Sequence, residues 1–160
     1  MIRMMVPLLL AMSFLLCVPA NAKSLTGKAR VVDGDTIIVS GERLRLMGFD
    51  APESRQTCLS PVGIERPCGR KATEYLDLVL STVDHQVACK TFGQDRYRRT
   101  LARCVIGDLY LGSWMVRSGH AVVWPWEDQW YLADQDDARL AERGLWAGQF
   151  EFPWVWRRAQ

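Results

Sequence analysis

A chain of 160 residues is the usual length of one folded domain, and 49% hydrophobic residues supply enough apolar side chains for one core. Its 20 Lys and Arg against 18 Asp and Glu give a formal net charge of only +2. A charge so close to zero excludes binding to nucleic acid through the field of the whole molecule. Any nucleic-acid site must therefore come from a local basic cluster, which the sequence offers at Arg96, Arg98, Arg99 and Arg103.

The first 22 residues have the organisation of a secretory signal peptide. Arg3 gives a positive start, residues 6–18 form an apolar run, and residues 19–22 place small side chains at the −3 and −1 positions of a cleavage site. Cys17 suggests a lipoprotein signal as the alternative, but the leucine before it is bulkier than that signal requires. We therefore expect cleavage after Ala22 and a periplasmic or secreted protein. The apolar run is too short to span a membrane, and no other stretch is long and apolar enough.

The stretch from residue 33 to residue 53 predicts a β-hairpin. Two short apolar runs, residues 36–39 and 44–47, flank a Ser40-Gly41 turn signal, and alternation with β-branched residues favours strands on both sides. Pro52 ends the ladder shortly after the second run, because proline has no backbone N–H to donate. We expect Asp33 to be structural and to close the turn before the first strand through its side chain.

The predicted hairpin brings three carboxylates and one guanidinium group together. Asp35 stands at the start of the first strand, and Arg45 lies inside the second. Asp50 and Glu53 follow just past the second strand. Carboxylates bind a hard divalent cation such as calcium, and arginine binds phosphate bidentately. These are the parts of a metal-assisted phosphodiesterase. The alternative is an ordinary hairpin with solvated charges. This interpretation is weaker, because the charged residues before the first strand and after the second occur together, with an arginine on the second strand between them.

The remaining chain predicts helices, one further hairpin and an aromatic tail. Helices are expected at three places: residues 70–80, 111–118 and 131–143. Strands are expected at residues 87–92 and 100–106, with residues 121–124 as a short strand or extended segment. The tail, residues 148–160, is rich in Trp and Phe, which rarely stay exposed in such numbers. We expect it to pack along a domain of residues 23–147, or to meet a partner.

Four cysteines remain after the signal peptide: Cys58, Cys68, Cys89 and Cys104. An even number in an exported chain indicates disulfides, for which the sequence alone allows three connectivities. We predict Cys58–Cys68, which closes the loop after Glu53, and Cys89–Cys104, whose members stand at similar distances from the centre of the second hairpin. Zinc is the competing interpretation, but the chain has no Cys-x-x-Cys pair and only two histidines.

Three blocks of the sequence resemble the thermonuclease (staphylococcal nuclease-like) family of exported bacterial proteins. They are Val-Asp-Gly-Asp-Thr at 32–36, Arg-Leu-Met-Gly-Phe-Asp-Ala-Pro-Glu at 45–53, and Asp-Arg-Tyr-Arg-Arg at 95–99. The resemblance runs from about Gly27 to Trp146. It implies an α+β fold, a five-stranded OB-fold barrel with three helices, where composition alone indicates only mixed α and β. It also implies a nuclease that uses calcium to hydrolyse DNA and RNA. We expect the protein to be a monomer.

The resemblance further implies which residues form the metal and water sites. It assigns calcium to the carboxylates of Asp35 and Asp50 and to the backbone carbonyl of Ala51. The family often has Thr at that last position, but a carbonyl ligand does not depend on the side chain. Glu53 matches the general base that acts on a water molecule, a role suited to a carboxylate that stays ionised near a cation.

Phosphate binding is implied for two arginines. Arg45 and Arg99 match the family residues that hold the phosphate, and a bidentate guanidinium clamp is something that lysine cannot copy. Tyr97 would contact a terminal phosphate or stack on a base, and Arg96 beside it is a further substrate-binding candidate. Arg98 departs from the family pattern, which usually has Gly there, so a turn that needs positive φ would be strained.

Other interpretations of the sequence stay open. The family's later tyrosines have no clean match, so stacking on a base would fall to nearby tryptophans, for which core packing is an equal alternative: Trp124, Trp126 and Trp130. The chain could also be a catalytically silent OB-fold module that binds nucleic acid or another anionic polymer, including in an exopolysaccharide-related role. A third alternative is a calcium-stabilised interaction domain that uses the aromatic tail.

Overall fold

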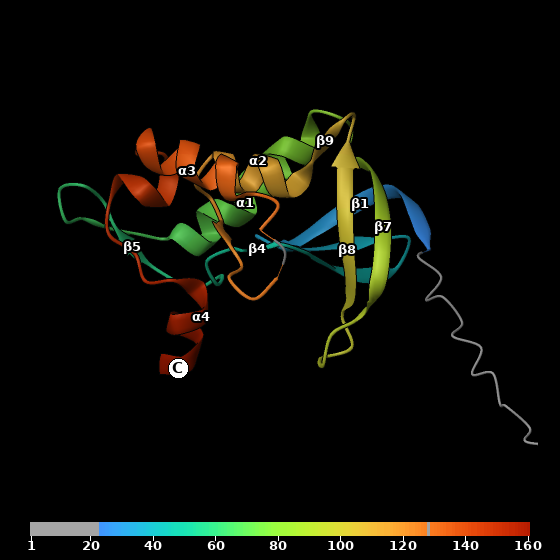
Figure 1. The fold of residues 1–160 in the computed structure, drawn as a ribbon, viewed down its shortest axis with the longest axis horizontal. Coiled ribbons are helices and arrows are strands. Elements are labelled where there is room, and N and C mark those ends of the chain that lie inside the picture. Colours follow the sequence, from blue (N-terminus) through green and yellow to red (C-terminus); the bar gives the residue numbers. More distant parts are fainter. Residues whose placement is uncertain (1–22, 128) are drawn as a thin grey trace, which may run out of the picture.

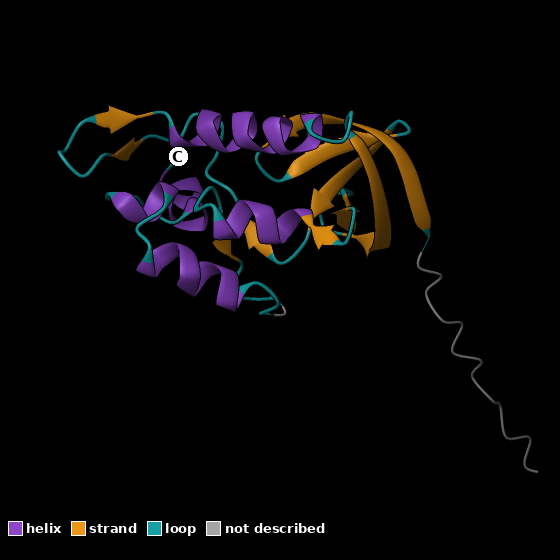
Figure 2. Ribbon diagram, turned by 90° about the horizontal axis from the view of Figure 1, so that it is seen from above, coloured by secondary structure: helices purple, strands orange, loops and turns teal. Residues whose placement is uncertain are grey.

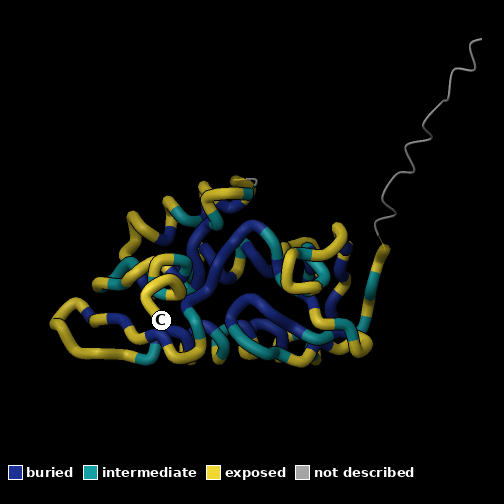
Figure 3. Tube along the Cα trace, turned by 90° about the horizontal axis from the view of Figure 1, so that it is seen from below, coloured by how far each residue is buried: buried dark blue, intermediate teal, exposed yellow. Residues whose placement is uncertain are grey.

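The computed structural model describes residues 23–127 and 129–160, so the predicted signal peptide lies outside the described residues. Long strands gather at one end of the molecule and helices at the other (Figures 1 and 2). The trace is buried where the two parts meet and exposed around the edge (Figure 3). One core therefore joins the strands to the helices.

Five strands form a closed barrel, which confirms the predicted OB-fold. They are β1 (Ser24–Asp33), β2 (Thr36–Val39), β3 (Glu42–Leu46), β7 (Gln86–Gln94) and β8 (Thr100–Ile106). The order β3-β2-β1-β7-β8 is antiparallel throughout, and a parallel pairing of β3 with β8 closes the barrel. The short β9 (Leu109–Tyr110) extends the sheet beyond β8.

The sequence pattern does not delimit β1, although this strand links the two hairpins of the barrel. β1 pairs with β2 on one side and with β7 on the other. Its inward positions carry small side chains such as Gly27 and Ala29, and charged side chains lie between them, so its apolar alternation is weak. The register of β1 and β2 shifts between Val31 and Asp33, a bulge that precedes the turn carrying Asp35.

Three helices confirm the predicted ones with small changes in their bounds. They are α1 (Cys68–Ser81), α2 (Leu111–Arg117) and α3 (Leu132–Leu140). α1 buries the apolar stripe that its spacing indicates, Ala72, Leu76, Val79 and Leu80. α3 ends before the predicted boundary, because Glu142 takes a positive φ of 49° that a continuing helix does not allow.

Short elements connect the barrel to the helices and the tail. They are β4 (Phe49–Asp50), β5 (Cys58–Leu59), β6 (Glu65–Arg66), β10 (Val122–Val123), the 3₁₀ turns η1 (Gly144–Ala147) and η2 (Arg157–Ala159), and α4 (Pro153–Trp156). The segment predicted at 121–124 is a strand only over β10, which pairs with β4 outside the barrel. That pairing fixes the chain around Asp50.

Both predicted disulfides are present. Cys58–Cys68 ties β5 to the first residue of α1. Cys89 and Cys104 lie directly opposite each other on β7 and β8, so their bridge crosses the barrel wall. Within residues 23–127 and 129–160, no helix is long and apolar enough to cross a membrane.

Candidate active site

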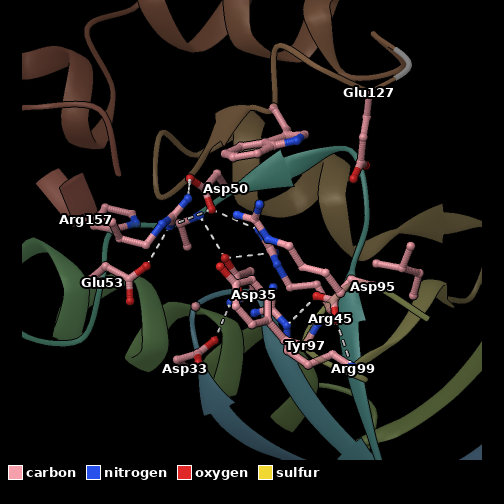
Figure 4. A pocket seen from close by; sticks show the side chains of 16 residues that line it. Asp33, Asp35, Arg45, Asp50, Glu53, Asp95, Tyr97, Arg99, Glu127 and Arg157 are labelled. Carbon is pink, nitrogen blue, oxygen red and sulfur yellow. Dashed lines mark hydrogen bonds and ion pairs between the residues drawn. The ribbon is translucent and has the colours of Figure 1, made fainter. Parts of the chain in front are cut away.

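A cavity of about 680 Å³ lies where β2, β3 and β4 meet the β7–β8 turn and the C-terminal tail. Figure 4 shows charged side chains from all these elements pointing toward one another. Six carboxylates and four guanidinium groups line it: Asp33, Asp35, Asp50, Glu53, Asp95, Glu127, Arg45, Arg96, Arg99 and Arg157. A fully ionised cavity thus carries two net negative charges, which one divalent cation would neutralise.

The first hairpin positions Asp35 against Arg45. Ser40 and Gly41 both have positive φ, 50° and 83°, as a two-residue type I′ turn requires. This turn sets the register in which Thr36 faces Arg45. The turn before β2 is closed as predicted, because the backbone N–H of Asp35 donates to Oδ1 of Asp33 at 3.1 Å.

Arg45 joins two of the predicted metal ligands. Its Nη1 lies 2.8 Å from Oδ2 of Asp35, and its Nη2 lies 2.9 Å from Oδ1 of Asp50. The same two nitrogens donate to the backbone carbonyls of Leu46 and Phe49 at 3.0 and 3.2 Å. Three of these contacts are hydrogen bonds and the fourth, to Asp35, is an ion pair, so the guanidinium is held between the two carboxylates.

Burial makes the carboxylates of this site costly to ionise. The side chain of Asp50 is fully buried, and burial raises its pKa to about 6 although Arg157 and Arg45 oppose the shift. Burial and the neighbouring charge of Asp35 likewise raise the pKa of Asp33 to about 6. Clustered carboxylates whose ionised forms repel one another favour the entry of a cation.

The loop that carries Glu53 is pinned from two sides. The backbone N–H of Glu53 donates to Oε1 of Gln56 at 3.1 Å, and Nε2 of the same glutamine donates to the carbonyl of Glu151 at 2.7 Å. Gln56 is fully buried. Gly69 in α1 lies so close to the carbonyl of Glu53 that any side chain would overlap it. The Glu53 carboxylate therefore projects from a fixed backbone.

The β7–β8 turn presents Arg99 and Tyr97 to the cavity. The carboxylate of Asp95 accepts the backbone N–H groups of Tyr97 and Arg99 at 2.8 and 2.9 Å, and Nε of Arg99 at 2.7 Å. Burial raises the pKa of Asp95, but these hydrogen bonds outweigh it and lower the pKa below its usual value. Arg98 has a φ of 62°, a conformation that costs a non-glycine residue about 1–2 kcal/mol, as its departure from the family pattern predicted.

The aromatic candidates separate into different environments. Tyr97 is 65% exposed, and the guanidinium of Arg96 lies 4.9 Å from its ring centroid. Trp124 lines the cavity, whereas Trp126 packs edge-on against Trp124 and Trp154 at 4.8 and 5.7 Å. Trp130 lies in a different hollow, beside β7 and β8. Of the three tryptophans, only Trp124 is placed to meet a ligand in the cavity.

Sequence reasoning missed Arg157, which enters the site from the C-terminal tail. Its Nη1 lies 2.6 Å from Oε1 of Glu53 and 3.1 Å from Oδ1 of Asp50, and its Nη2 lies 2.8 Å from Oδ2 of Asp50. Burial lowers the pKa of Arg157, but the bonds to Asp50 and Glu53 outweigh it and raise the pKa above its usual value. The sequence shows a pair of arginines after the aromatic residues of the tail, but this pattern does not indicate that one of them contacts Asp50.

The donor atoms of the site fit a hard divalent cation. Asp35 and Asp50 supply carboxylate oxygens, and the backbone N–H of Ala51 bonds to Oδ2 of Asp35 at 3.2 Å, which places the Ala51 peptide beside them. In the described part of the chain, no three acidic, His or Cys side chains gather closely enough to hold a metal by themselves. Backbone oxygen, water and a phosphate oxygen would have to complete the coordination.

Comparisons with known proteins agree with this geometry. A family model described as staphylococcal nuclease homologue matches residues 43–148. A succinoglycan biosynthesis protein, ExoI, of Rhizobium meliloti is 36% identical over 132 residues, which are 81% of this chain and 69% of that relative. A thermonuclease of Staphylococcus intermedius is 29% identical over 126 residues, 73% of each chain. A rice protein named probable staphylococcal-like nuclease CAN3 is 28% identical over 137 residues, and the chain spans only 31% of its length.

Proposed function

The chain belongs to the staphylococcal nuclease family, and from this premise we propose that it is a calcium-dependent nuclease that hydrolyses phosphodiester bonds in DNA and RNA. The observation that carries the proposal is the arrangement around Arg45. One guanidinium group bridges Asp35 and Asp50 at 2.8 and 2.9 Å, and the carboxylate of Glu53 and the guanidinium of Arg99 line the same cavity. A module with no catalytic role would have no need of this whole set.

Each group has a chemical task in the proposed reaction. Glu53 accepts a proton from the water that attacks phosphorus. The P–O bond on the far side breaks, and the leaving oxygen takes up a proton from solvent water. Arg45 and Arg99 donate to the non-bridging oxygens, where negative charge develops. Calcium held by Asp35, Asp50 and the Ala51 carbonyl would supply a positive charge beside the same oxygens. Tyr97 and Arg96, at the exposed rim, bind the neighbouring part of the strand.

The role proposed for Arg45 requires it to exchange partners. The N–H groups on its two Nη atoms face an ion pair with Asp35 and hydrogen bonds to Asp50 and two backbone carbonyls. A phosphate oxygen can take over one of these N–H groups once the carboxylates bind a cation instead. Arg99 needs less change, because its side-chain bond to Asp95 uses Nε and does not occupy its two Nη atoms.

We also propose that the protein acts in the periplasm or outside the cell, as a monomer. The two disulfides support this location, because such bonds persist in oxidising compartments. The predicted cleavage after Ala22 would deliver the mature chain there. N-terminal sequencing of the exported protein tests the cleavage site, and light scattering tests the monomer.

The test of the proposed function is digestion of plasmid DNA and of single-stranded RNA by the purified mature protein. We expect cleavage with calcium, none with a chelator, and none by the Asp35→Asn or Asp50→Asn variant with calcium present. Cleavage that is equally fast in chelator would overturn the calcium assignment. Intact nucleic acid under all conditions would overturn the nuclease itself.

A second candidate is a catalytically silent OB-fold module that binds an anionic polymer. It is favoured by one observation, the name of the 36% identical relative, a succinoglycan biosynthesis protein. Binding of an acidic polysaccharide by Arg96 and Arg99 would then replace phosphate binding. The two candidates are told apart by the digestion assay together with a titration with acidic polysaccharide.

A further inference from the structure

The C-terminal tail reaches the site that is assigned to the cation. In Figure 4, Arg157 lies between Asp50 and Glu53, on the side of Asp50 opposite to Arg45. It donates to both oxygens of Asp50, at 3.1 and 2.8 Å, and to Oε1 of Glu53 at 2.6 Å. One guanidinium group thus holds a proposed metal ligand and the proposed general base at once.

The two oxygens of Asp50 are therefore both engaged by protein cations. Oδ1 accepts from Arg45 and from Arg157, and Oδ2 accepts from Arg157. A guanidinium group that donates to these oxygens places positive charge beside the position a metal would take, so metal binding is favoured when a donor gives way. Arg45 has an exposed side-chain fraction of only 12% and is fixed by two further carbonyls. Arg157 is 36% exposed and is the partner that can move.

The position of Arg157 does not depend on its ion pairs alone. Pro153 at the start of α4 is buried, and the ring of Trp154 packs edge-on against Trp124 at 5.6 Å between centroids. Before α4, Gln149 pairs with Leu59 through two backbone hydrogen bonds of 2.8 and 3.0 Å. The tail is therefore anchored at several points before the chain reaches residue 157.

We propose that Arg157 is an internal counter-cation that sets the affinity of this site for its divalent cation. Without the cation, it balances the charge of Asp50 and Glu53 and holds both carboxylates in place. When the cation binds to Asp50, the like charge of the guanidinium group is repelled and Arg157 leaves that carboxylate. The proposal rests on the proposed function, because it needs Asp35 and Asp50 to be the cation site.

The consequence is that removing Arg157 strengthens cation binding. A cation entering the wild-type site must displace a bidentate ion pair, whereas in Arg157→Gln the one charged donor left to Asp50 among the described residues is Arg45, on Oδ1, and Oδ2 loses its charged partner. We expect Arg157→Gln to bind calcium at least about 10-fold more tightly, which corresponds to 1.4 kcal/mol.

Arg158 supplies a matched control. It is the next residue, is exposed, and loses the same charge when replaced by glutamine. Its guanidinium lies over the ring of Trp126 at 6.0 Å, and the described residues give it no carboxylate partner. Arg158→Gln therefore reports the effect of net charge alone, and we expect its calcium affinity to stay within about twofold of the wild type.

The experiment is calorimetric titration of calcium into the metal-free mature wild type, Arg157→Gln, Arg158→Gln and Arg157→Lys at one ionic strength. Calcium binding that is tighter in Arg157→Gln than in both the wild type and Arg158→Gln supports the proposal, including when the wild type binds too weakly to measure. Equal affinity in Arg157→Gln and Arg158→Gln, or weaker binding by Arg157→Gln, overturns it while leaving the cation site intact. If Arg157→Gln does not fold, Arg157→Lys, which cannot bridge both carboxylates bidentately, must still bind more tightly than the wild type. Binding by none of the folded variants overturns both this proposal and the calcium part of the proposed function.

Discussion

Arg45 and Arg99 differ in what holds their guanidinium groups. Replacement of each by lysine therefore tests two roles, phosphate binding and support of the buried carboxylates. Arg45 is 12% exposed and ties Asp35 to Asp50, whereas Arg99 is 32% exposed and is oriented by Asp95. Lysine keeps the charge but lacks the planar fork that makes two parallel hydrogen bonds. Replacement of either arginine should therefore remove the transition-state contacts that we propose for it, but only the change at Arg45 also leaves buried carboxylates with fewer donors.

We expect Arg45→Lys and Arg99→Lys each to lower kcat by roughly 10²-fold or more. Arg45→Lys should also lower the free energy of unfolding of the metal-free protein by about 1–3 kcal/mol, because hydrogen bonds to buried charged groups are lost. Arg99→Lys should change that free energy little. Steady-state kinetics and urea unfolding measure the two effects, with the exposed neighbour Arg98→Lys as the control. Wild-type kcat in both variants would move the phosphate site elsewhere.

His120 provides a pH-dependent contribution to stability that is separate from the cavity. Its ring stacks on Tyr75 with centroids 4.1 Å apart, and its Nδ1 lies 2.9 Å from the hydroxyl oxygen of Ser118. Burial, helped by the positive charge of Lys71, lowers its pKa from 6.5 to about 4. The folded state therefore holds the neutral ring, and the unfolded chain takes up a proton first as the pH falls.

The stability contributed by neutral His120 is complete above pH 6.5 and is lost as the pH falls toward its folded pKa of about 4. At 1.36 kcal/mol per pKa unit, the lowering from 6.5 to about 4 corresponds to a loss on the order of 3 kcal/mol. We expect His120→Gln to flatten the dependence of the unfolding free energy on pH between 6.5 and 4, measured by urea unfolding at several pH values. An unchanged slope in the variant would show that His120 is solvated and titrates normally.

At the scale of elements, the start of α1 supports the loop that carries Glu53. Gly69 sits in the first turn of the helix, against the carbonyl of Glu53, and its N–H donates to the carbonyl of Gln56 at 3.1 Å. A methyl group there cannot be accommodated by rotating a side chain, because the atoms it meets belong to the backbone. Helix and loop would have to separate.

We expect Gly69→Ala to lower kcat by about 10-fold or more, because a displacement near 1 Å misplaces the proposed base. Its melting temperature should also fall, although alanine favours a helix by about 1 kcal/mol over glycine. Leu78→Ala is the matched control, since Leu78 lies on the same helix and is 61% exposed. A Gly69→Ala protein with wild-type kcat and melting temperature would contradict the close contact.

Local sequence patterns predicted the helices and strands, but they could not predict contacts between residues far apart in the sequence. The hairpin of β2 and β3 and the three helices follow from apolar periodicity and from turn residues close in sequence. Asp35, Arg45 and Asp50 meet because one hairpin and the strand after it bring them together. Arg157 reaches Asp50 across 107 positions, and no periodicity reports such a contact. The aromatic content of the tail predicted that the tail packs on the domain. Which residue Arg157 contacts depends on how the tail packs, and the composition does not reveal that.

At the scale of the whole molecule, the two disulfides stabilise different parts. Cys89 and Cys104 belong to the core shared by the barrel, α1 and α2. Cys58 and Cys68 lie in a second cluster with Val122 and Leu145, against which Phe150 and Trp154 of the tail also pack. The first bridge therefore secures the barrel wall that leads to Arg99. The second secures the junction of the Glu53 loop, α1 and the tail.

The two bridges should accordingly have similar effects on stability and different effects on activity. They close segments with sequence separations of 10 and 15, so each is expected to add about 2–3 kcal/mol to the free energy of unfolding. A domain has only about 5–15 kcal/mol in total, so loss of both should lower the melting temperature strongly. We test this with the Cys58→Ala/Cys68→Ala and Cys89→Ala/Cys104→Ala double variants, by urea unfolding and by kcat.

The activity of the folded variants separates the two parts of the molecule. Loss of Cys58–Cys68 loosens the loop of Glu53 and the anchor of Arg157 together, so kcat should fall even where the protein remains folded. Loss of Cys89–Cys104 leaves β7 and β8 joined by their hydrogen-bond ladder, so a folded variant should keep most of its kcat. Equal kcat in both folded variants would mean that the barrel and the β4–β10 pairing alone hold the Glu53 loop, and that the tail contributes nothing to its position.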